Sequence, residues 1–312
     1  MSVELDHEVQ VALEDWVRSG ARGARATPIA EARASYPDVT AAFDPRPPEV
    51  GSIEELVVPG ADGPLRARLY VPTEPAPRSG LVLWLHGGGW IQGGIESHDR
   101  ALRHLVELSG QRFFAVDYRL APEHRFPAGL DDATAALRWS VEHARDLGAS
   151  SDRVAIGGDS AGASLALVAA LEVGHDRRRP ALQILCYPSL GPVLVTESQR
   201  DFDHRFGLTC DDMAYYFEQY LDDDQDRADP RLSPLLSVDL KAAPRSIVTV
   251  AGFDPLRDEG FALVGLLQSS GVKVELLDEA SLVHGYLCLG GLNAAHEALE
   301  RLGSAIRAAL SG

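Results

Sequence analysis

The sequence predicts an α/β fold with an eight-stranded, mostly parallel sheet, helices on both faces of the sheet and a helical cap. Two observations predict the sheet: apolar segments of strand length recur along most of the chain, and helical segments separate them, as parallel pairing requires. A third observation predicts the cap, because helix-like sequence precedes the first strand and interrupts the alternation late in the chain. At 312 residues the chain is long enough to bury one large core.

The N-terminal segment, residues 1–50, is expected to be helical and to form one part of the cap. Apolar residues lie at helical spacing near its start: Val9, Ala12, Leu13, Trp16 and Val17. Prolines follow at several positions from Pro28 to Pro48. Each of them, Pro37 included, is expected to break the helical structure.

The sheet is expected to open with an antiparallel hairpin of residues 53–58 and 65–71, joined by a Pro-Gly-Ala-Asp-Gly turn. Further segments then alternate with helices and complete the eight strands: 81–85, 112–116, 153–157, 182–187, 246–251 and 272–277. The predicted α/β core therefore comprises residues 51–188 and 244–312.

Residues 189–243 contain only helix-like pieces, such as 209–218, and are expected to form a helical cap or lid above the strand ends. Together with the N-terminal helices, this insertion is expected to wall the pocket and exclude water. The alternative is a long surface excursion. Five aromatic residues are candidates either for the pocket wall or for the core: Trp90, Phe206, Tyr215, Tyr216 and Phe217.

The most informative segment is Gly-Asp-Ser-Ala-Gly at 158–162, between an apolar strand and the helical segment 163–170. A G-x-S-x-G sequence in this context predicts a nucleophile elbow, a strained turn that presents the serine hydroxyl to a cleft. The turn also places Ser160 at a helix N-terminus, where backbone N–H groups favour negative charge. Ser160 is therefore the candidate nucleophile, and the alternative is an ordinary glycine-rich turn.

Residues 86–90, His-Gly-Gly-Gly-Trp, directly follow the apolar strand 81–85. Three successive glycines cost conformational entropy, so the fold or the chemistry must need bare backbone there. Acyl transfer supplies a reason, because backbone N–H groups stabilise the oxyanion that forms when a serine attacks an ester carbonyl. We expect the N–H groups of Gly88, Gly89 and Ala161 to form this oxyanion hole. His86 is expected to support the loop.

A serine hydroxyl needs a base, and the base needs an orienting acid. Asp254 and His284 each follow a predicted strand, and they come after Ser160 in the order expected for a nucleophile elbow. The other histidines lack this context. Asp258 is the rival acid, but Asp254 lies nearer the strand end and Pro255 fixes the turn beside it. Asp258 is expected to cap or brace the next helix.

Five motifs follow one pattern of order and spacing: His-Gly-Gly-Gly-Trp at 86–90, Asp-Tyr-Arg-Leu-Ala-Pro-Glu at 117–123, Gly-Asp-Ser-Ala-Gly at 158–162, Asp-Pro-Leu-Arg-Asp at 254–258 and His-Gly-Tyr at 284–286. In these motifs the chain resembles the carboxylesterases of the hormone-sensitive-lipase-like group in the α/β-hydrolase superfamily. The resemblance covers about Pro72 to Leu289 and implies the same Ser160, Asp254, His284 triad and the same oxyanion donors. It also implies a mainly structural role for the 117–123 stretch.

The resemblance implies a serine carboxylesterase that hydrolyses small, uncharged esters of short to medium acyl chains through an acyl-enzyme, with no cofactor and no metal. Departures from the group are mild: Tyr286 stands where phenylalanine is frequent, and Asp159 where aspartate and glutamate alternate. Neither is expected to affect the chemistry. Two alternatives stay open: a binding or receptor module on the same fold, and a lactonase, deacetylase or amidase with the same machinery. Relatives also often pair through the last strand, which favours a homodimer.

Charge and cysteine content exclude other classes of protein. Lys and Arg number 29 against 46 Asp and Glu, a net charge of −17, which argues against nucleic-acid or anionic-membrane partners. No apolar run approaches the roughly 18 residues of a membrane span, and no signal peptide is evident. A cytoplasmic protein with no stable membrane insertion is expected. The three cysteines lack metal-binding spacing, and Cys186 is expected to be a buried thiol.

Overall fold

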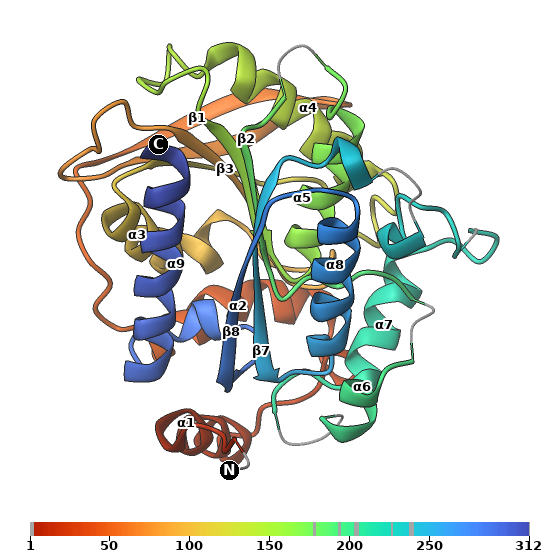
Figure 1. Cartoon of the computed structure of the whole chain (residues 1–312). Coiled ribbons are helices and arrows are strands. Elements are labelled where there is room, and N and C mark those ends of the chain that lie inside the picture. The colour runs from red at the N-terminus through yellow and green to blue at the C-terminus, as the bar shows by residue number, and fades with distance from the viewer. Residues whose placement is uncertain are drawn as a thin grey trace.

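The structure is a computed structural model that describes residues 3–176, 179–192, 195–202, 206–225, 227–236 and 240–311. At its centre is one eight-stranded sheet with the order β1-β2-β4-β3-β5-β6-β7-β8 (Figure 1). β1 pairs with β2 and β2 with β4 in antiparallel fashion, and the other neighbours are parallel. The strands are β1 (Ser52–Gly60), β2 (Gly63–Val71), β3 (Leu81–Leu85), β4 (Arg112–Val116), β5 (Val154–Asp159), β6 (Leu182–Cys186), β7 (Arg245–Phe253) and β8 (Val274–Val283).

Helices cover both faces of this sheet, which confirms the predicted fold class (Figure 1). On one face α3 (Ile95–Ser109) packs beside α9 (Asn293–Ser311). On the other face lie α4 (Ala128–His143), α5 (Ala161–Glu172) and α8 (Arg257–Ser269). β3, β5 and β6 are buried at every position, because helices cover both of their faces. None of the described helices is long and apolar enough to cross a membrane.

The parallel strands bring their carboxyl ends to one edge of the sheet, where binding sites of open α/β sheets form. Ser160 follows β5, Asp254 follows β7 and His284 follows β8 at this edge. β8 ends at Val283 rather than at the expected residue 277, so His284 follows the strand directly instead of lying within a loop.

A bulge interrupts the pairing of β7 with β8 next to this edge. The register shifts between Ala251 and Phe253. Gly252 lies so close to β8 that a Cβ on it would overlap the carbonyl oxygen of Ala280, so the position requires glycine. Bulges commonly re-aim neighbouring side chains, and this one lies just before Asp254.

The N-terminal segment forms α1 (His7–Arg18), a 3₁₀ turn at Ala24–Ala26 and α2 (Ile29–Phe43). Pro28 immediately precedes α2, in keeping with its expected role as a break. Pro37, however, lies inside α2, and the helix continues through it. The expectation that Pro37 breaks the helix is therefore wrong.

A proline inside a helix removes one backbone hydrogen bond, which destabilises the helix. Contacts outside the helix explain why α2 tolerates Pro37. The guanidinium group of Arg33, one turn earlier, donates to the carbonyl oxygens of Ile91 and Ala121, both at 2.7 Å. The same group pairs with Glu123 at 2.7 Å. These contacts fix α2 against the loops that follow β3 and β4, so tertiary contacts offset the missing hydrogen bond.

Residues 189–243 contribute α6 (Glu197–Asp201) and α7 (Cys210–Tyr220), and their described part contains no strand. α7 contacts the N-terminal segment. Ala24 N–H donates to Asp212 at 2.6 Å, and Arg25 pairs with Glu218 at 2.8 Å. The two segments expected to form the cap are thus joined to each other, while the division of the chain into cap and core stays a prediction.

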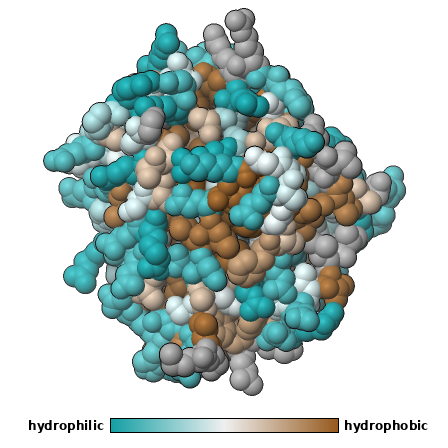
Figure 2. Space-filling view, viewed as in Figure 1, coloured by the Kyte–Doolittle hydropathy of each residue, from teal (hydrophilic) through white to brown (hydrophobic). Residues whose placement is uncertain are grey.

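Figure 2 shows the face of the molecule that is drawn in Figure 1. Hydrophilic residues cover most of this face, and hydrophobic residues gather toward its centre, over β8 and α8. Phe261 and Leu266 of α8 are each 38% exposed. β8 is an edge strand that pairs with β7 alone in the described sheet. This edge therefore combines unpaired backbone with exposed apolar side chains.

Candidate active site

Ser160 lies at the turn between β5 and α5, with φ 52° and ψ −120°. A non-glycine residue with positive φ is strained, so the surrounding structure must hold it. The turn lies directly against the end of β3. A Cβ on either Gly158 or Gly162 would overlap the carbonyl oxygen of Leu85. Both glycines of the motif are therefore required by close packing, and the serine is left at the apex.

Three side chains from separate loops form one chain of hydrogen bonds. Nε2 of His284 lies 2.9 Å from Oγ of Ser160, and Nδ1 lies 2.8 Å from Oδ2 of Asp254. The backbone N–H of Leu256 donates to Oδ1 of Asp254 at 2.8 Å. Because an ionised carboxylate can only accept, Nδ1 of His284 carries the proton, and Nε2 is left to accept the serine proton.

The contacts of His284 show which of the two candidate acids, Asp254 or Asp258, lies beside it. Asp254 is fully buried beneath the imidazole, whose own side chain is 12% exposed toward the cavity. Asp258 lies in the first turn of α8 and accepts a hydrogen bond from Ser198 N–H of α6 at 2.8 Å. The ring of Tyr187 packs edge-on against the imidazole, with 4.8 Å between centroids. The structure brings Asp254, rather than Asp258, to His284.

The loop after β3 contains the expected oxyanion donors. Gly88 has φ 119° and Gly89 has φ 61°, values that favour glycine. A Cβ on Gly89 would also overlap the ring of Tyr216 from α7. Gly88, Gly89 and Ala161 line the same cavity as Ser160. Their role as donors stays a prediction.

His86 lies where a support for this loop was expected. Its ring stacks on Tyr118, with 4.3 Å between centroids, and its Nδ1–H donates to the carbonyl oxygen of Gly87 at 2.8 Å. The hydroxyl of Tyr118 donates to the carbonyl oxygen of His86 at 2.7 Å. Burial lowers the pKa of His86 to about 3, so the imidazole is neutral at physiological pH.

Asp159 makes contacts that the sequence analysis did not anticipate. Its carboxylate accepts a hydrogen bond from Gly87 N–H at 3.1 Å and one from Trp84 Nε1–H at 3.3 Å, and it lies 3.2 Å from Nε2 of His98. Burial acts to raise the pKa of Asp159, but His98, His86 and the Gly87 N–H outweigh it and lower the pKa. A buried carboxylate thus ties the nucleophile turn to the glycine loop.

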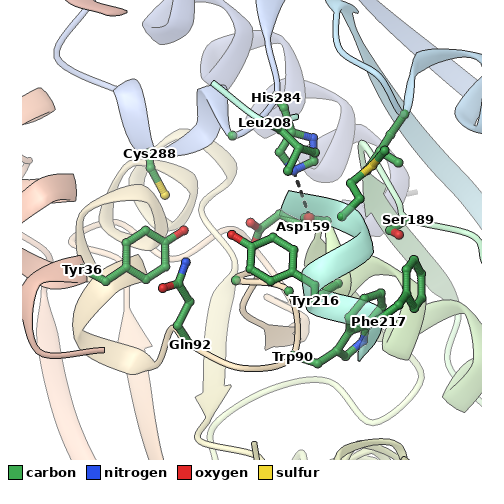
Figure 3. A pocket seen from close by; sticks show the side chains of 17 residues that line it. Tyr36, Trp90, Gln92, Asp159, Ser189, Leu208, Tyr216, Phe217, His284 and Cys288 are labelled. Atoms are coloured by element: carbon green, nitrogen blue, oxygen red, sulfur yellow. Dashed lines mark hydrogen bonds between the residues drawn. The ribbon is translucent and has the colours of Figure 1, made fainter. Parts of the chain in front are cut away.

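These groups open into one cavity of about 100 Å³ (Figure 3). Side chains from α2, α7 and the strand-end loops line it, and none of the described lining residues is Lys or Arg. The lining comprises Tyr36, Gly88, Gly89, Trp90, Gln92, Asp159, Ser160, Ala161, Ser189, Leu208, Met213, Tyr216, Phe217, Leu256, His284, Gly285 and Cys288. In the described part of the chain, no group of three or more His, Cys, Asp or Glu side chains is arranged to hold a metal ion.

Three of the five aromatic candidates line this cavity: Trp90, Tyr216 and Phe217. Phe206 instead packs against Phe202 and Phe253, with centroids 5.6 Å and 5.3 Å away. Tyr215 lies beneath the guanidinium of Arg25 at 5.2 Å. Helical spacing alone could not distinguish the face of α7 that meets the cavity from the face that meets the N-terminal segment.

Glu259 links α8 to the start of the 189–243 insertion. Its side chain is 1% exposed, and it accepts hydrogen bonds from Leu190 N–H at 2.7 Å and from Gln199 Nε2 at 3.2 Å. Burial raises the pKa of Glu259 to about 8, and the nearby Asp254 contributes to the rise. The carboxyl group is therefore largely protonated at neutral pH.

Comparison with known proteins defines the class of this chain. Residues 82–288 match the family with the α/β hydrolase fold, and the chain belongs to that family. The carboxylic ester hydrolase LipN of Mycobacterium tuberculosis is 42% identical over 270 residues, which cover 83% of this chain and 71% of LipN. The ethyl acetate hydrolase of Pseudomonas putida is 36% identical over 268 residues, which cover 84% of each chain.

Solved structures of esterases share the whole fold. An ester hydrolase from the metagenome of Lake Arreo has a TM-score of 0.92 at 33% identity, with 97% of this chain and 98% of that chain covered. An esterase from Pyrobaculum calidifontis has a TM-score of 0.90 at 31% identity, with 99% and 100% covered. These relatives confirm the predicted enzyme class, a carboxylesterase of the hormone-sensitive-lipase-like group.

Proposed function

We propose that this protein hydrolyses uncharged carboxylic esters with short to medium acyl chains through a covalent acyl-enzyme. Ser160 is the nucleophile, His284 is the general base and then the general acid, and Asp254 orients and stabilises the imidazole. The observation that carries the proposal is the hydrogen-bonded chain from Asp254 through His284 to Ser160, which ends in a cavity beside Gly88 and Gly89.

In the acylation step, Nε2 of His284 takes the hydroxyl proton of Ser160 as Oγ attacks the ester carbonyl. The carbonyl oxygen becomes an anion, and preorganised backbone N–H groups of the kind proposed here each contribute about 100- to 1000-fold in rate. The donors are the N–H groups of Gly88, Gly89 and Ala161. The buried carboxylate of Asp254 stabilises the imidazolium, which then protonates the departing alcohol.

In the deacylation step, water takes the place of the alcohol and attacks the acyl carbonyl. Nε2 of His284 accepts a proton from this water, and the same N–H donors hold the second oxyanion. The imidazolium then returns its proton to Oγ of Ser160, the carboxylic acid is released, and the starting state is restored. The proton transfer between Oγ of Ser160 and Nε2 of His284 joins two atoms that lie 2.9 Å apart in the structure.

The size and charge of the cavity support the proposed substrate class. The cavity of about 100 Å³ is small, which favours short substituents next to the carbonyl group. The absence of Lys and Arg from the described lining offers no partner for an anionic substituent. The ethyl acetate hydrolase and an acetyl esterase of Salmonella paratyphi A, which is 33% identical over 234 residues, are named for small uncharged esters.

We propose that segments 1–50 and 189–243 together act as a cap over this cavity. Tyr36 of α2 and Tyr216 of α7 both line the cavity, and the two segments are joined by the pairing of Arg25 with Glu218. A cap of this kind excludes water from the acyl-enzyme and shapes the pocket.

We also propose that the protein works as a cytoplasmic homodimer paired through β8. The support for the dimer is the unpaired edge of β8 and the exposed apolar residues Phe261 and Leu266 beside it (Figure 2). The cytoplasmic location rests on the sequence alone. Sedimentation velocity is expected to give the mass of two chains, and the mass of one chain at micromolar concentration would contradict this pairing.

A fluorophosphonate probe tests the catalytic assignment, because it reacts only with an activated serine. One probe per chain is expected, on the peptide that contains Ser160, and p-nitrophenyl butyrate should release a stoichiometric burst of p-nitrophenol. Ser160→Ala should fold normally, take no label and lose on the order of 10⁵-fold in kcat. Ser189→Ala, which alters another serine of the cavity lining, should keep the label on Ser160.

Two outcomes would contradict the assignment. Turnover by Ser160→Ala at the wild-type rate would show that another group carries the reaction. Tight binding of an ester by the wild-type protein without release of alcohol would support the alternative of a binding module. An ester panel of graded acyl length, run beside a lactone and an amide, would define the substrate class.

A further inference from the structure

The cavity has two chemically different sides (Figure 3). The polar side, as we call it, is lined by Tyr36, Gln92 and Cys288. The aromatic side is lined by Trp90 and Phe217, whose ring centroids lie 5.0 Å apart. The imidazole of His284 lies between the two sides in Figure 3, and Oγ of Ser160 lies 2.9 Å from its Nε2. An ester carbonyl at that serine would therefore direct its two substituents into different environments.

Two tyrosine hydroxyls face the same space on the polar side. Tyr36 comes from α2 and Tyr216 from α7, and each points its hydroxyl toward the other (Figure 3). No hydrogen bond joins the two hydroxyls or ties either of them to another described residue, and the same holds for the side-chain amide of Gln92. The polar side therefore offers donors and acceptors that the described part of the protein does not itself use.

The groups on the polar side are uncharged. Burial raises the pKa of Tyr36 well above its usual range, and the neighbouring Cys288 and Asp159 add to the rise. Burial likewise raises the pKa of Tyr216 and of the Cys288 thiol. Gln92 carries no charge at any pH. A ligand that meets this side is thus offered hydroxyl, amide and thiol groups in their neutral forms, without a cationic partner.

We infer that the polar side is a subsite for an uncharged hydrogen-bonding substituent of the ester, such as a hydroxyl group, held between Tyr36 and Tyr216. The inference rests on the proposed catalytic role of Ser160, because the substituent is defined by its place next to the reacting carbonyl. A hydroxyl group can accept from one tyrosine and donate to the other or to Gln92.

A methyl group in the same place would fill the space but leave the surrounding polar groups unpaired. Sites built to hydrogen-bond a substrate hydroxyl discriminate strongly against analogues that lack it, because the buried groups then have no partner. The enzyme is therefore specific for hydroxy esters over methyl-substituted esters of the same shape. Since the acyl or the alcohol part of the ester can carry the hydroxyl, both sources are tested.

Two matched pairs of substrates measure this preference. Ethyl 3-hydroxybutanoate carries a hydroxyl group on the acyl part where ethyl 3-methylbutanoate carries a methyl group. 2-Hydroxypropyl acetate and isobutyl acetate differ in the same way on the alcohol part. The expected result is that the ratio of kcat/KM, hydroxy ester over methyl isostere, exceeds one in at least one pair. The two esters of a pair can differ in intrinsic chemical reactivity. This contribution to the kcat/KM ratio is the same for every enzyme variant, so it cancels when the ratios of variants are compared.

Tyr36→Phe and Tyr216→Phe are each expected to lower this ratio about five-fold in the pair that shows the preference, the size expected for one neutral hydrogen bond. Tyr215→Phe is the matched control, because it removes a tyrosine hydroxyl next to Tyr216 in α7 that does not line the cavity. Its ratio is expected to equal that of the wild-type enzyme. Circular dichroism of each variant checks the fold.

The outcomes separate this inference from the proposed function. Hydrolysis of all four esters with ratios below one in both pairs, or ratios that Tyr36→Phe and Tyr216→Phe leave unchanged, would overturn the subsite and leave the serine mechanism standing. An equal drop in the Tyr215→Phe control would also overturn it. Failure of the wild-type enzyme to hydrolyse any ester would instead overturn the proposed function.

Discussion

The floor of the active site and its walls are built in different ways. We define the floor as residues 86–90 and 158–162. The walls are α2, the 3₁₀ turn Ala24–Ala26 that precedes it, and α7. The helix that follows the nucleophile, α5, is buried from Ala161 to Ala170, whereas α2 buries only Thr40 and α7 buries three of its residues. Backbone packing and buried hydrogen bonds hold the floor, and exposed ion pairs contribute much of the contact between the walls.

This difference implies that the floor holds a fixed geometry while the walls can open. Elements with many buried apolar contacts open rarely, and elements with few such contacts open at low free-energy cost. The floor carries the proposed oxyanion donors and the proposed nucleophile, and a misplacement of such groups by about 1 Å can cost about 100-fold in rate. The walls must let substrate in and product out. Substitutions in the floor are therefore expected to have larger effects than substitutions in the walls.

The largest effect on stability is expected for Gly162→Ala in the floor. The new Cβ would overlap the carbonyl oxygen of Leu85, and neither backbone can move without disturbing β3 or β5. The free energy of unfolding should fall by about 3 kcal/mol or more in urea titrations. Gly265→Ala in α8 is the control, because a Cβ there has nothing within 4 Å, and it should stabilise by about 0.5–1 kcal/mol. Similar losses for both variants would refute the close-packing argument.

A smaller effect, on rate, is expected for Asp159→Asn. The amide keeps one acceptor for Gly87 N–H but loses the charge that faces His98, so the glycine loop is held less firmly. The value of kcat should fall about 10- to 100-fold, with a smaller change in KM. Asp258→Asn is the matched control, since Asp258 bonds to α6 rather than to the loop. A wild-type kcat for Asp159→Asn would show that the loop does not need this support.

A pH-dependent effect is expected at Glu259, where α8 meets the 189–243 insertion. Its pKa is about 8 in the folded protein against 4.5 in the unfolded chain, so the folded state retains a proton that the unfolded state loses in this interval. The contribution of Glu259 to stability is thus fully present below about pH 4.5 and is lost as the pH rises through 8. Glu259→Gln cannot lose a proton, so its free energy of unfolding should decline less between pH 5 and pH 8. Equal slopes for the two proteins would contradict this.

The smallest effect is expected for Arg25→Ala in the walls. Arg25 pairs with Glu218 and Asp211 on the surface, and all of these side chains are largely exposed. Solvent screens such pairs, so the unfolding midpoint should not change measurably. The local contact between the N-terminal segment and α7 should loosen, which limited proteolysis would detect as faster cleavage near residue 25. A large loss of global stability would show that the walls are part of the core after all.

The floor could be predicted from the sequence because each of its requirements is local. Strand, tight turn and helix follow one another around Ser160, and the glycines that close packing demands stand at fixed offsets from it. Asp254 and His284 were found in the same way, as polar residues at strand ends, although their roles stay predictions. The strand positions followed from apolar runs. β8 is longer than expected because Asp278 and Glu279 continue the pairing with β7 and Val283 pairs with Phe253 beyond the bulge.

The walls could not be predicted in the same detail, because their contacts join residues far apart in the chain. Nothing near Tyr36 in sequence indicates that its hydroxyl faces that of Tyr216. In the sequence Asp159 is only a mild variation within its motif, although its place beside Ser160 in a fully buried strand indicates that its charge needs partners. Pro37 suggested a helix break, and the contacts of Arg33 that keep α2 intact lie outside any local pattern.

The bonds of Arg33 couple the first 40 or so residues mechanically to the chemistry. One of its carbonyl acceptors, Ile91, lies two residues beyond Gly89, in the loop that contains the proposed oxyanion donors. Proteolytic loss of the N-terminal arm would thus do more than widen the entrance. It would remove the Arg33 contacts that hold this loop in place. Activity is therefore expected to require an intact N-terminal segment.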